Sequence, residues 1–74
     1  MNKQIRSRRI ASNELIMPDG TMLPMQVVLL EEGFVVRTHP LEKEEAGTEW
    51  LQGQIVLRNE QSGIRAYYKN QQLL

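Results

Sequence analysis

The stretch Val27-Val28-Leu29-Leu30-Glu31-Glu32-Gly33-Phe34-Val35-Val36 decides the fold class of this 74-residue chain. Both of its ends are rich in β-branched and aromatic residues, which favour strands. The acidic residues and the glycine between them are typical of a short hairpin loop, in which Gly33 would supply the positive φ. The stretch therefore predicts two adjacent antiparallel strands.

Turn signals recur along the rest of the chain at intervals typical of short strands. The sequence Met17-Pro18-Asp19-Gly20 suits a type I turn, because proline presets φ at its second position and glycine accepts a left-handed exit. Apolar residues alternate in 34–39 and 54–58 at the two-residue period of a strand. Only residues 41–46 tolerate a helix, and they are too few to form a stable one. We predict an all-β fold, a small antiparallel β-sandwich or partly open barrel of about six short strands.

The strands are expected to enclose one core within residues 9–69, between a flexible basic tail of residues 1–8 and a C-terminal tail of residues 70–74. The strand over residues 9–17 should be bent or bulged near Ser12-Asn13. Residues 25–30 are apolar on both faces, so this strand should be covered twice or meet a partner. The predicted core consists of Met25, Val27, Leu29, Phe34, Val36, Trp50, Ile55, Leu57, Ile64 and either Tyr67 or Tyr68.

Composition limits the classes of function. The chain has no cysteine, which excludes disulfides, thiolate metal sites and thiol chemistry. Nine basic and nine acidic residues cancel, so no bulk field selects nucleic acid or an acidic membrane. The longest apolar run, residues 27–30, is far too short to cross a bilayer, and no apolar signal-peptide core is recognisable. We expect a cytoplasmic location without membrane contact.

No catalytic, cofactor-binding or metal-binding residue and no small-molecule substrate is predicted. His39 is the only histidine, and Pro40 after it favours extended backbone, so His39 is expected at the end of a strand. The glutamates of residues 42–49 are interpreted as a solvated acidic loop, because a general acid–base pair requires burial. The glycines are spread one to a turn, unlike those of a phosphate-binding loop.

The aromatic residues suggest a surface for a protein partner. Trp50 is the only tryptophan, and its large indole is expected in the core rather than against a ligand. Tyr67 and Tyr68 are adjacent on a predicted strand, so one ring should face the core and the other solvent or a partner. We predict a non-catalytic protein-interaction or structural module that forms a homo-oligomer or binds a protein partner. The candidate interface residues are Tyr67, Tyr68, Val28 and Leu30.

The basic N-terminal segment supplies an alternative. Lys3, Arg6, Arg8 and Arg9 precede any acidic residue and could contact phosphates as a flexible arm, or serve only as a solubilising tail. No aromatic stacking platform accompanies them, which favours the tail. The alternative function is a small nucleic-acid-binding β-barrel module in which Arg6, Arg8 and Arg9 contact the nucleic acid.

Residues 12–20, 27–36 and 49–57 follow one another as a strand with a Pro-Asp-Gly turn, two strands around Glu-Glu-Gly, and a strand that begins Glu-Trp-Leu-Gln-Gly. This order resembles the small β-domain beside the barrel of amidohydrolase-superfamily enzymes of the dihydroorotase and chlorohydrolase type. In that family a His-x-His metal motif follows, whereas this chain has residues 58–64, Arg-Asn-Glu-Gln-Ser-Gly-Ile. The resemblance thus implies a freestanding β-domain without the metal-binding barrel, and no catalytic residue is transferred.

Overall fold

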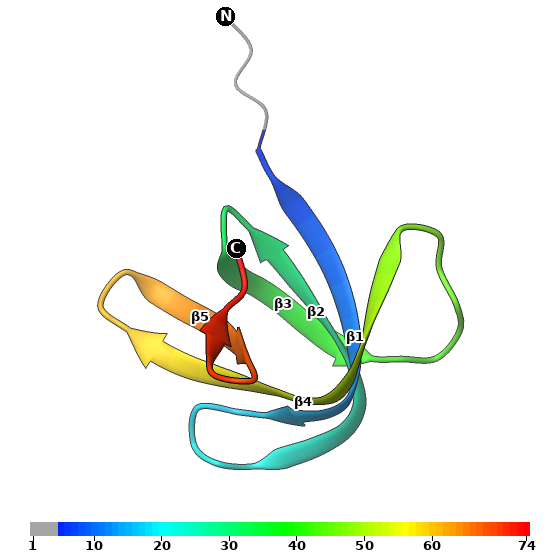
Figure 1. The fold of residues 1–74 in the computed structure, drawn as a ribbon, viewed down its shortest axis with the longest axis horizontal. Coiled ribbons are helices and arrows are strands. Elements are labelled where there is room, and N and C mark those ends of the chain that lie inside the picture. The colour runs from blue at the N-terminus through cyan, green and yellow to red at the C-terminus, as the bar shows by residue number, and fades with distance from the viewer. Residues whose placement is uncertain (1–4) are drawn as a thin grey trace, which may run out of the picture.

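Six strands and no helix make up the part of the chain that the computed structural model describes, residues 5–74. The all-β prediction is confirmed (Figure 1). The strands are β1 (Ser7–Ile16), β2 (Met22–Glu31), β3 (Phe34–Pro40), β4 (Thr48–Glu60), β5 (Gly63–Tyr68) and β6 (Gln71–Gln72).

Five of these strands close into a barrel. The order along the sheet is β3-β2-β1-β4-β5-β6, and β3 also pairs with β5 through Phe34 and Arg65. The Arg65 guanidinium lies 3.5 Å over the Phe34 ring and covers this seam. One pair departs from the predicted antiparallel arrangement, because β1 and β4 are parallel. A parallel pair requires a crossover connection, and here the chain leaves β3 and returns to the far side of β1 through residues 41–47, called the arch below.

Local turn chemistry agrees with the sequence. Glu32 and Gly33 both have positive φ, 52° and 80°, as a two-residue hairpin loop requires. The Gly20 N–H donates to the Met17 carbonyl at 2.8 Å, which closes the predicted turn between β1 and β2. The helix-tolerant segment 41–46 forms no helix and instead belongs to the arch.

A bulge divides β1 and β4 into two halves. The register between these strands shifts between Ser12 and Glu14, which confirms the predicted irregularity. Opposite it, Gly53 has a φ of 111° and donates its N–H to Asn13 Oδ1 at 2.7 Å. The neighbouring Gln52 carbonyl accepts a hydrogen bond of 2.7 Å from the Tyr68 hydroxyl. Two side chains thus satisfy backbone groups that the bulge removes from the ladder.

The barrel interior holds the core, but bulges change which residues face it. Val27, Ile55 and Leu57 are buried as predicted, whereas Met25, Val36 and Trp50 are 42%, 55% and 48% exposed. Val36 is exposed because the β2–β3 register shifts beside it, so it has no cross-strand partner. Trp50 pairs with Ala11, whose neighbour Ile10 points inside, so the indole lies on the outer face. The core cluster consists of Ile10, Leu15, Val28, Leu30, Ile55, Leu57 and Ala66.

The remaining predicted core residues Leu29, Phe34 and Ile64 are half-buried. Both predicted tails also differ from the structure. Residues 1–4 lie outside the described part, but β1 already begins at Ser7, and the Glu32 N–H donates to the Arg6 carbonyl at 2.8 Å. At the other end β6 pairs with β5, and Leu73 packs against the core while its N–H donates to the Ala66 carbonyl at 2.8 Å. The ordered part of the chain is therefore longer than residues 9–69.

Candidate binding groove

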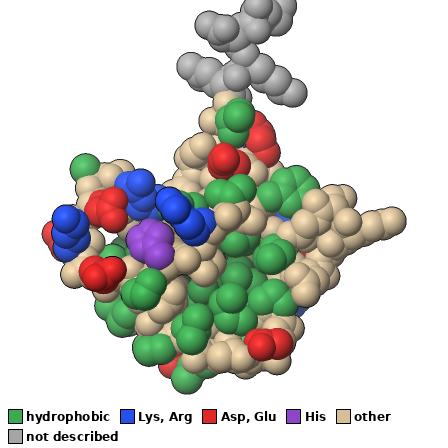
Figure 2. Space-filling model, turned by 180° about the vertical axis from the view of Figure 1, so that it is seen from behind, with side chains coloured by type: hydrophobic (Ala, Val, Ile, Leu, Met, Phe, Trp, Pro, Cys, Tyr) green, Lys and Arg blue, Asp and Glu red, His purple; other side chains and the backbone are tan. Residues whose placement is uncertain are grey.

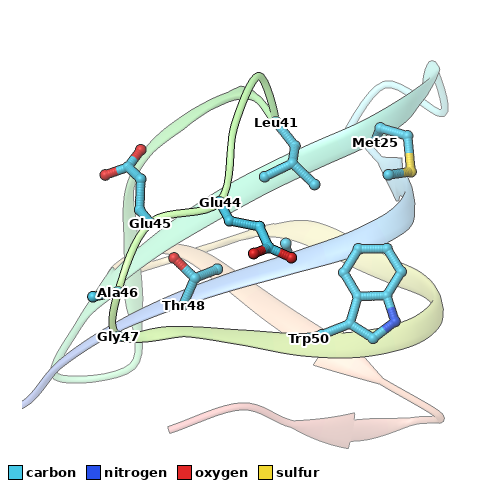
Figure 3. Close-up of a pocket in the computed structure, with 9 residues that line it drawn as sticks. Met25, Leu41, Glu44, Glu45, Ala46, Gly47, Thr48 and Trp50 are labelled. Atoms are coloured by element: carbon cyan, nitrogen blue, oxygen red, sulfur yellow. The ribbon is translucent and has the colours of Figure 1, made fainter.

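The arch stands away from the outer face of the barrel and leaves a groove of about 720 Å³ beneath it (Figure 3). Met25 comes from β2, Ala11 from β1, and Thr48 and Trp50 from β4. Leu41 and Glu44 come from the arch itself. We call this the arch groove.

The arch is held at both ends. At the β3 end, the Leu41 N–H donates to the Met25 carbonyl at 2.9 Å. At the β4 end, Arg9 Nη1 donates to the Ala46 carbonyl at 3.4 Å and lies 3.5 Å from the Glu45 carboxylate. These contacts fix where the arch leaves and rejoins the barrel, so the groove is part of the folded structure.

The floor of the groove is apolar and its rim is acidic. Trp50 and Met25 lie side by side and are nearly half exposed, while Ala11 between their strands is buried. The Glu44 carboxylate turns under the arch towards the indole, whereas Glu45 points away from the groove (Figure 3). Among residues 5–74, no lysine or arginine forms an ion pair with Glu44. The groove therefore combines an exposed aromatic ring with a carboxylate that lacks a counter-ion.

On the rear face of the molecule, charged side chains of the arch lie at one edge, and an apolar area occupies the centre (Figure 2). A docking partner on this side would meet both kinds of surface. The chemistry available is recognition, through apolar contact and charge.

The predicted interface residues are divided between core and surface. Val28 and Leu30 are fully buried in the barrel, so they are corrected to core residues that no partner can reach. Tyr68 packs against the core, and Tyr67 lies on the outer face, which is the division expected for neighbouring residues of a strand. The Tyr67 hydroxyl donates to a Glu60 carboxylate oxygen, which raises the pKa of Tyr67 above its ordinary value.

The arginines of β1 are engaged within the molecule. Arg8 makes a two-pronged contact with Glu49, at 2.8 Å from Nε and 2.7 Å from Nη2, and also donates to the Leu74 carbonyl. This pairing lowers the pKa of the Glu49 carboxyl and raises that of Arg8. Arg9 contacts Glu45, so the basic segment and the acidic loop face each other across the parallel pair. Arg6 is exposed, and its backbone N–H donates to Glu32 Oε1.

His39 lies near the end of β3, as predicted, with Nδ1 2.9 Å from the Pro40 carbonyl oxygen. Within residues 5–74, no group of histidine, aspartate and glutamate side chains is arranged to hold a metal ion. No helix in this part of the chain is long and apolar enough to span a membrane.

Sequence reasoning missed the arch groove. Its floor joins residues from three strands, and the β1–β4 pairing that brings Trp50 beside Ala11 could not be read from local patterns. One signal was present: Trp50 lies between Glu49 and Leu51, so alternation places the indole on the same face as polar Thr48 and Gln52.

Comparison of this chain with family models, curated proteins and solved structures gave no match. The likeness to the amidohydrolase β-domain therefore stays a prediction from the sequence.

Proposed function

We propose that this chain is a non-catalytic protein-interaction module that binds a basic segment of a partner protein in the arch groove. The observation that carries the proposal is the exposed Trp50 indole beside Met25, under the Glu44 carboxylate. Tryptophan and methionine are enriched in protein interfaces. Tryptophan is also enriched among binding hot spots, as are tyrosine and arginine.

The exposed indole leaves binding energy available. A tryptophan side chain presents ~200 Å² of surface, and about half of it is still in contact with water here. Covering the remaining ~100 Å² would contribute roughly 2 to 3 kcal/mol at the usual value per unit area. A partner that covers Met25 as well would gain more.

Charge selects the kind of partner. Glu44 attracts a cation, and a lysine or arginine side chain entering beside it can place its charge near the face of the indole. The apolar stem of such a side chain would contact Met25 and Leu41, since long basic side chains bury their methylene groups while the charge stays solvated. The two ends of the arch are already anchored, so ordering the groove costs little on binding.

Three further expectations remain predictions from the sequence. Self-association is the first of these, and the β3–β5 pairing covers the β3 edge of the sheet that a second copy could otherwise extend. The groove is therefore assigned to a basic segment of another protein, and a second copy of this chain is the alternative that sedimentation tests. The cytoplasmic location and the likeness to the amidohydrolase β-domain are the other two.

The fluorescence of Trp50, the only tryptophan, reports directly on the groove. Titration with a short oligolysine should change its intensity and emission maximum, whereas an oligoglutamate of the same length should not. Glu44→Gln should weaken oligolysine binding about fivefold, the effect of roughly 1 kcal/mol of charge interaction. Glu42→Gln is the matched control, because it removes the same charge from the same loop outside the arch groove.

If Glu44→Gln and Glu42→Gln lose equal affinity for oligolysine, the binding is general charge attraction and the groove is refuted as the site. Sedimentation velocity at micromolar concentration, with and without oligolysine, tests whether a second copy of this chain occupies the groove. A dimer that Trp50→Ala dissociates would assign the groove to a second copy.

A further inference from the structure

A second surface differs in charge from the arch groove. The outer face of the β4–β5 hairpin and the turn that follows it carry Arg58, Tyr67 and Lys69 around a hollow of about 290 Å³. The amide side chains of Gln52, Gln54 and Asn70 also line this hollow. We call these six residues the β4–β5 face.

Its cations are supported by aromatic rings. The Arg58 guanidinium lies 4.4 Å over the Tyr67 ring, and Lys69 Nζ lies 5.4 Å from the centroid of Tyr68. Stacking orders the Arg58 side chain while leaving its hydrogen-bond donors and the outer side of its plane available. By contrast, the ion pairs found within residues 5–74 use Arg8 and Arg9.

The strand register concentrates positive charge further. Arg58 is directly opposite Arg65 in the β4–β5 ladder, and like charges in such pairs are destabilising. Glu60 on this hairpin accepts the Tyr67 hydroxyl and keeps its negative charge, so the three cations Arg58, Arg65 and Lys69 face one carboxylate. The Arg58–Arg65 pair therefore violates the rule against like charges in opposite positions of a ladder, and the same pair attracts anions. Violations of local stability rules are expected at functional sites.

We infer that the β4–β5 face binds single-stranded nucleic acid. The planar Arg58–Tyr67 stack offers a platform for a base, since bases stack on guanidinium planes and on aromatic rings. The amide side chains of Gln52 and Asn70 can hydrogen-bond to base edges, whereas Gln54 Nε2 already donates to Glu14 Oε1 at 2.7 Å. Lys69 and Arg65 can contact phosphates. This surface differs from the N-terminal arginines predicted for nucleic-acid contact, and it is separate from the arch groove.

Fluorescence anisotropy with labelled oligothymidylate and oligouridylate of about 12 nucleotides tests the inference, because one small β-barrel occupies roughly 4 to 16 nucleotides. Binding should weaken as salt rises, with a logarithmic slope of about −1.4 for roughly two phosphate contacts to a single strand. The double variant Arg58→Ala/Lys69→Ala should bind at least tenfold more weakly, because a lost base stack costs about that factor.

The matched control is Arg37→Ala/Lys43→Ala, which removes one arginine and one lysine charge at exposed positions elsewhere. It should bind within about twofold of the unmodified protein. Arg58→Lys keeps the charge and loses the plane, so it should weaken binding several-fold while the salt slope is unchanged. Circular dichroism and thermal unfolding confirm that each variant is folded.

Three results would overturn the inference. The first is that neither oligonucleotide changes its anisotropy at low salt. The second is that the two double variants lose equal affinity for the oligonucleotide. The third is that phosphatidylserine vesicles bind as strongly as the oligonucleotides and that Arg58→Lys does not weaken this vesicle binding. The last result would assign the surface to anionic lipid. Oligolysine binding at the arch groove is measured separately, so either proposal can fail alone.

Discussion

The N-terminal half of β1 and the β4–β5 hairpin both carry arginines, but the fold gives those arginines opposite surroundings. Arg8 and Arg9 lie beside Glu49 and Glu45, so their charge is compensated within the molecule. Arg58 and Arg65 lie opposite each other and rest on aromatic rings. A cluster of basic residues in sequence is therefore a poor guide to a binding surface when the topology places carboxylates next to it.

The bulge at Gln52 and Gly53 lies in β4 between the part that pairs with the N-terminal half of β1 and the part that forms the β4–β5 hairpin. Breaking its support should have the largest effect on stability. Asn13→Ala removes the acceptor of the Gly53 N–H, a partly buried contact. We expect the free energy of unfolding to fall by about 1 to 3 kcal/mol, because a partly buried donor loses its partner. Urea denaturation measures the change, and Asn59→Ala, at an exposed position of β4, is the control. Equal stability of the two variants would mean that water or another group replaces Asn13.

The ion-paired region should show a moderate and pH-dependent contribution. Arg8→Ala is expected to lower the free energy of unfolding by about 1 kcal/mol, near the upper end for an exposed pair, because the contact is two-pronged. The coupling between Arg8 and Glu49 is measured by a double-mutant cycle with Glu49→Gln. A coupling near zero would show that this contact does not hold β1 against β4.

The sign of the pH dependence follows from Glu49. The hydrogen bond from the Arg8 side chain lowers the pKa of Glu49 below the ordinary glutamate value in the folded state, so the pair stabilises the fold above the unfolded pKa. That contribution is lost as the pH falls through the folded pKa. The stability difference between the unmodified protein and Glu49→Gln should therefore be largest near neutral pH and shrink below about pH 4. A difference that grows on acidification would contradict this assignment.

The β4–β5 face should show the smallest effect on stability. Arg58→Ala loses a cation–π contact worth about 0.5 to 1 kcal/mol but also relieves repulsion from Arg65, so the net change should lie within about 0.5 kcal/mol. Thermal unfolding of Arg58→Ala and Arg8→Ala side by side measures the contrast. If Arg58→Ala were the more destabilising variant, the β4–β5 face would be structural.

Sequence patterns predicted the strands and turns well and predicted side-chain surroundings less well. The hairpin at Glu32-Gly33 and the turn at Pro18 depend on residues within a few positions of each other, so their chemistry is visible locally. Trp50 was expected in the core because it is large and apolar. Its actual position depends on the register in which β4 pairs with β1, where Trp50 is opposite Ala11. No local pattern specifies that pairing.

The candidate sites show the same division. The acidic character of the arch and the adjacency of Tyr67 and Tyr68 were evident from the sequence. The groove under the arch was not, because it needs Met25 and Trp50 from separate strands. The stacking of Arg58 on Tyr67 depends on the register of one hairpin, which a slip of one residue would reverse.

The sequence by itself determined that this chain is built from short strands, because β-branched runs and turn residues act through the backbone nearest to them. Tertiary structure decided which arginines are neutralised and which side of each strand is covered. The reason is that the register shifts in the β1–β4 and β2–β3 pairs are not specified locally, and that the parallel pair joins residues about 40 positions apart.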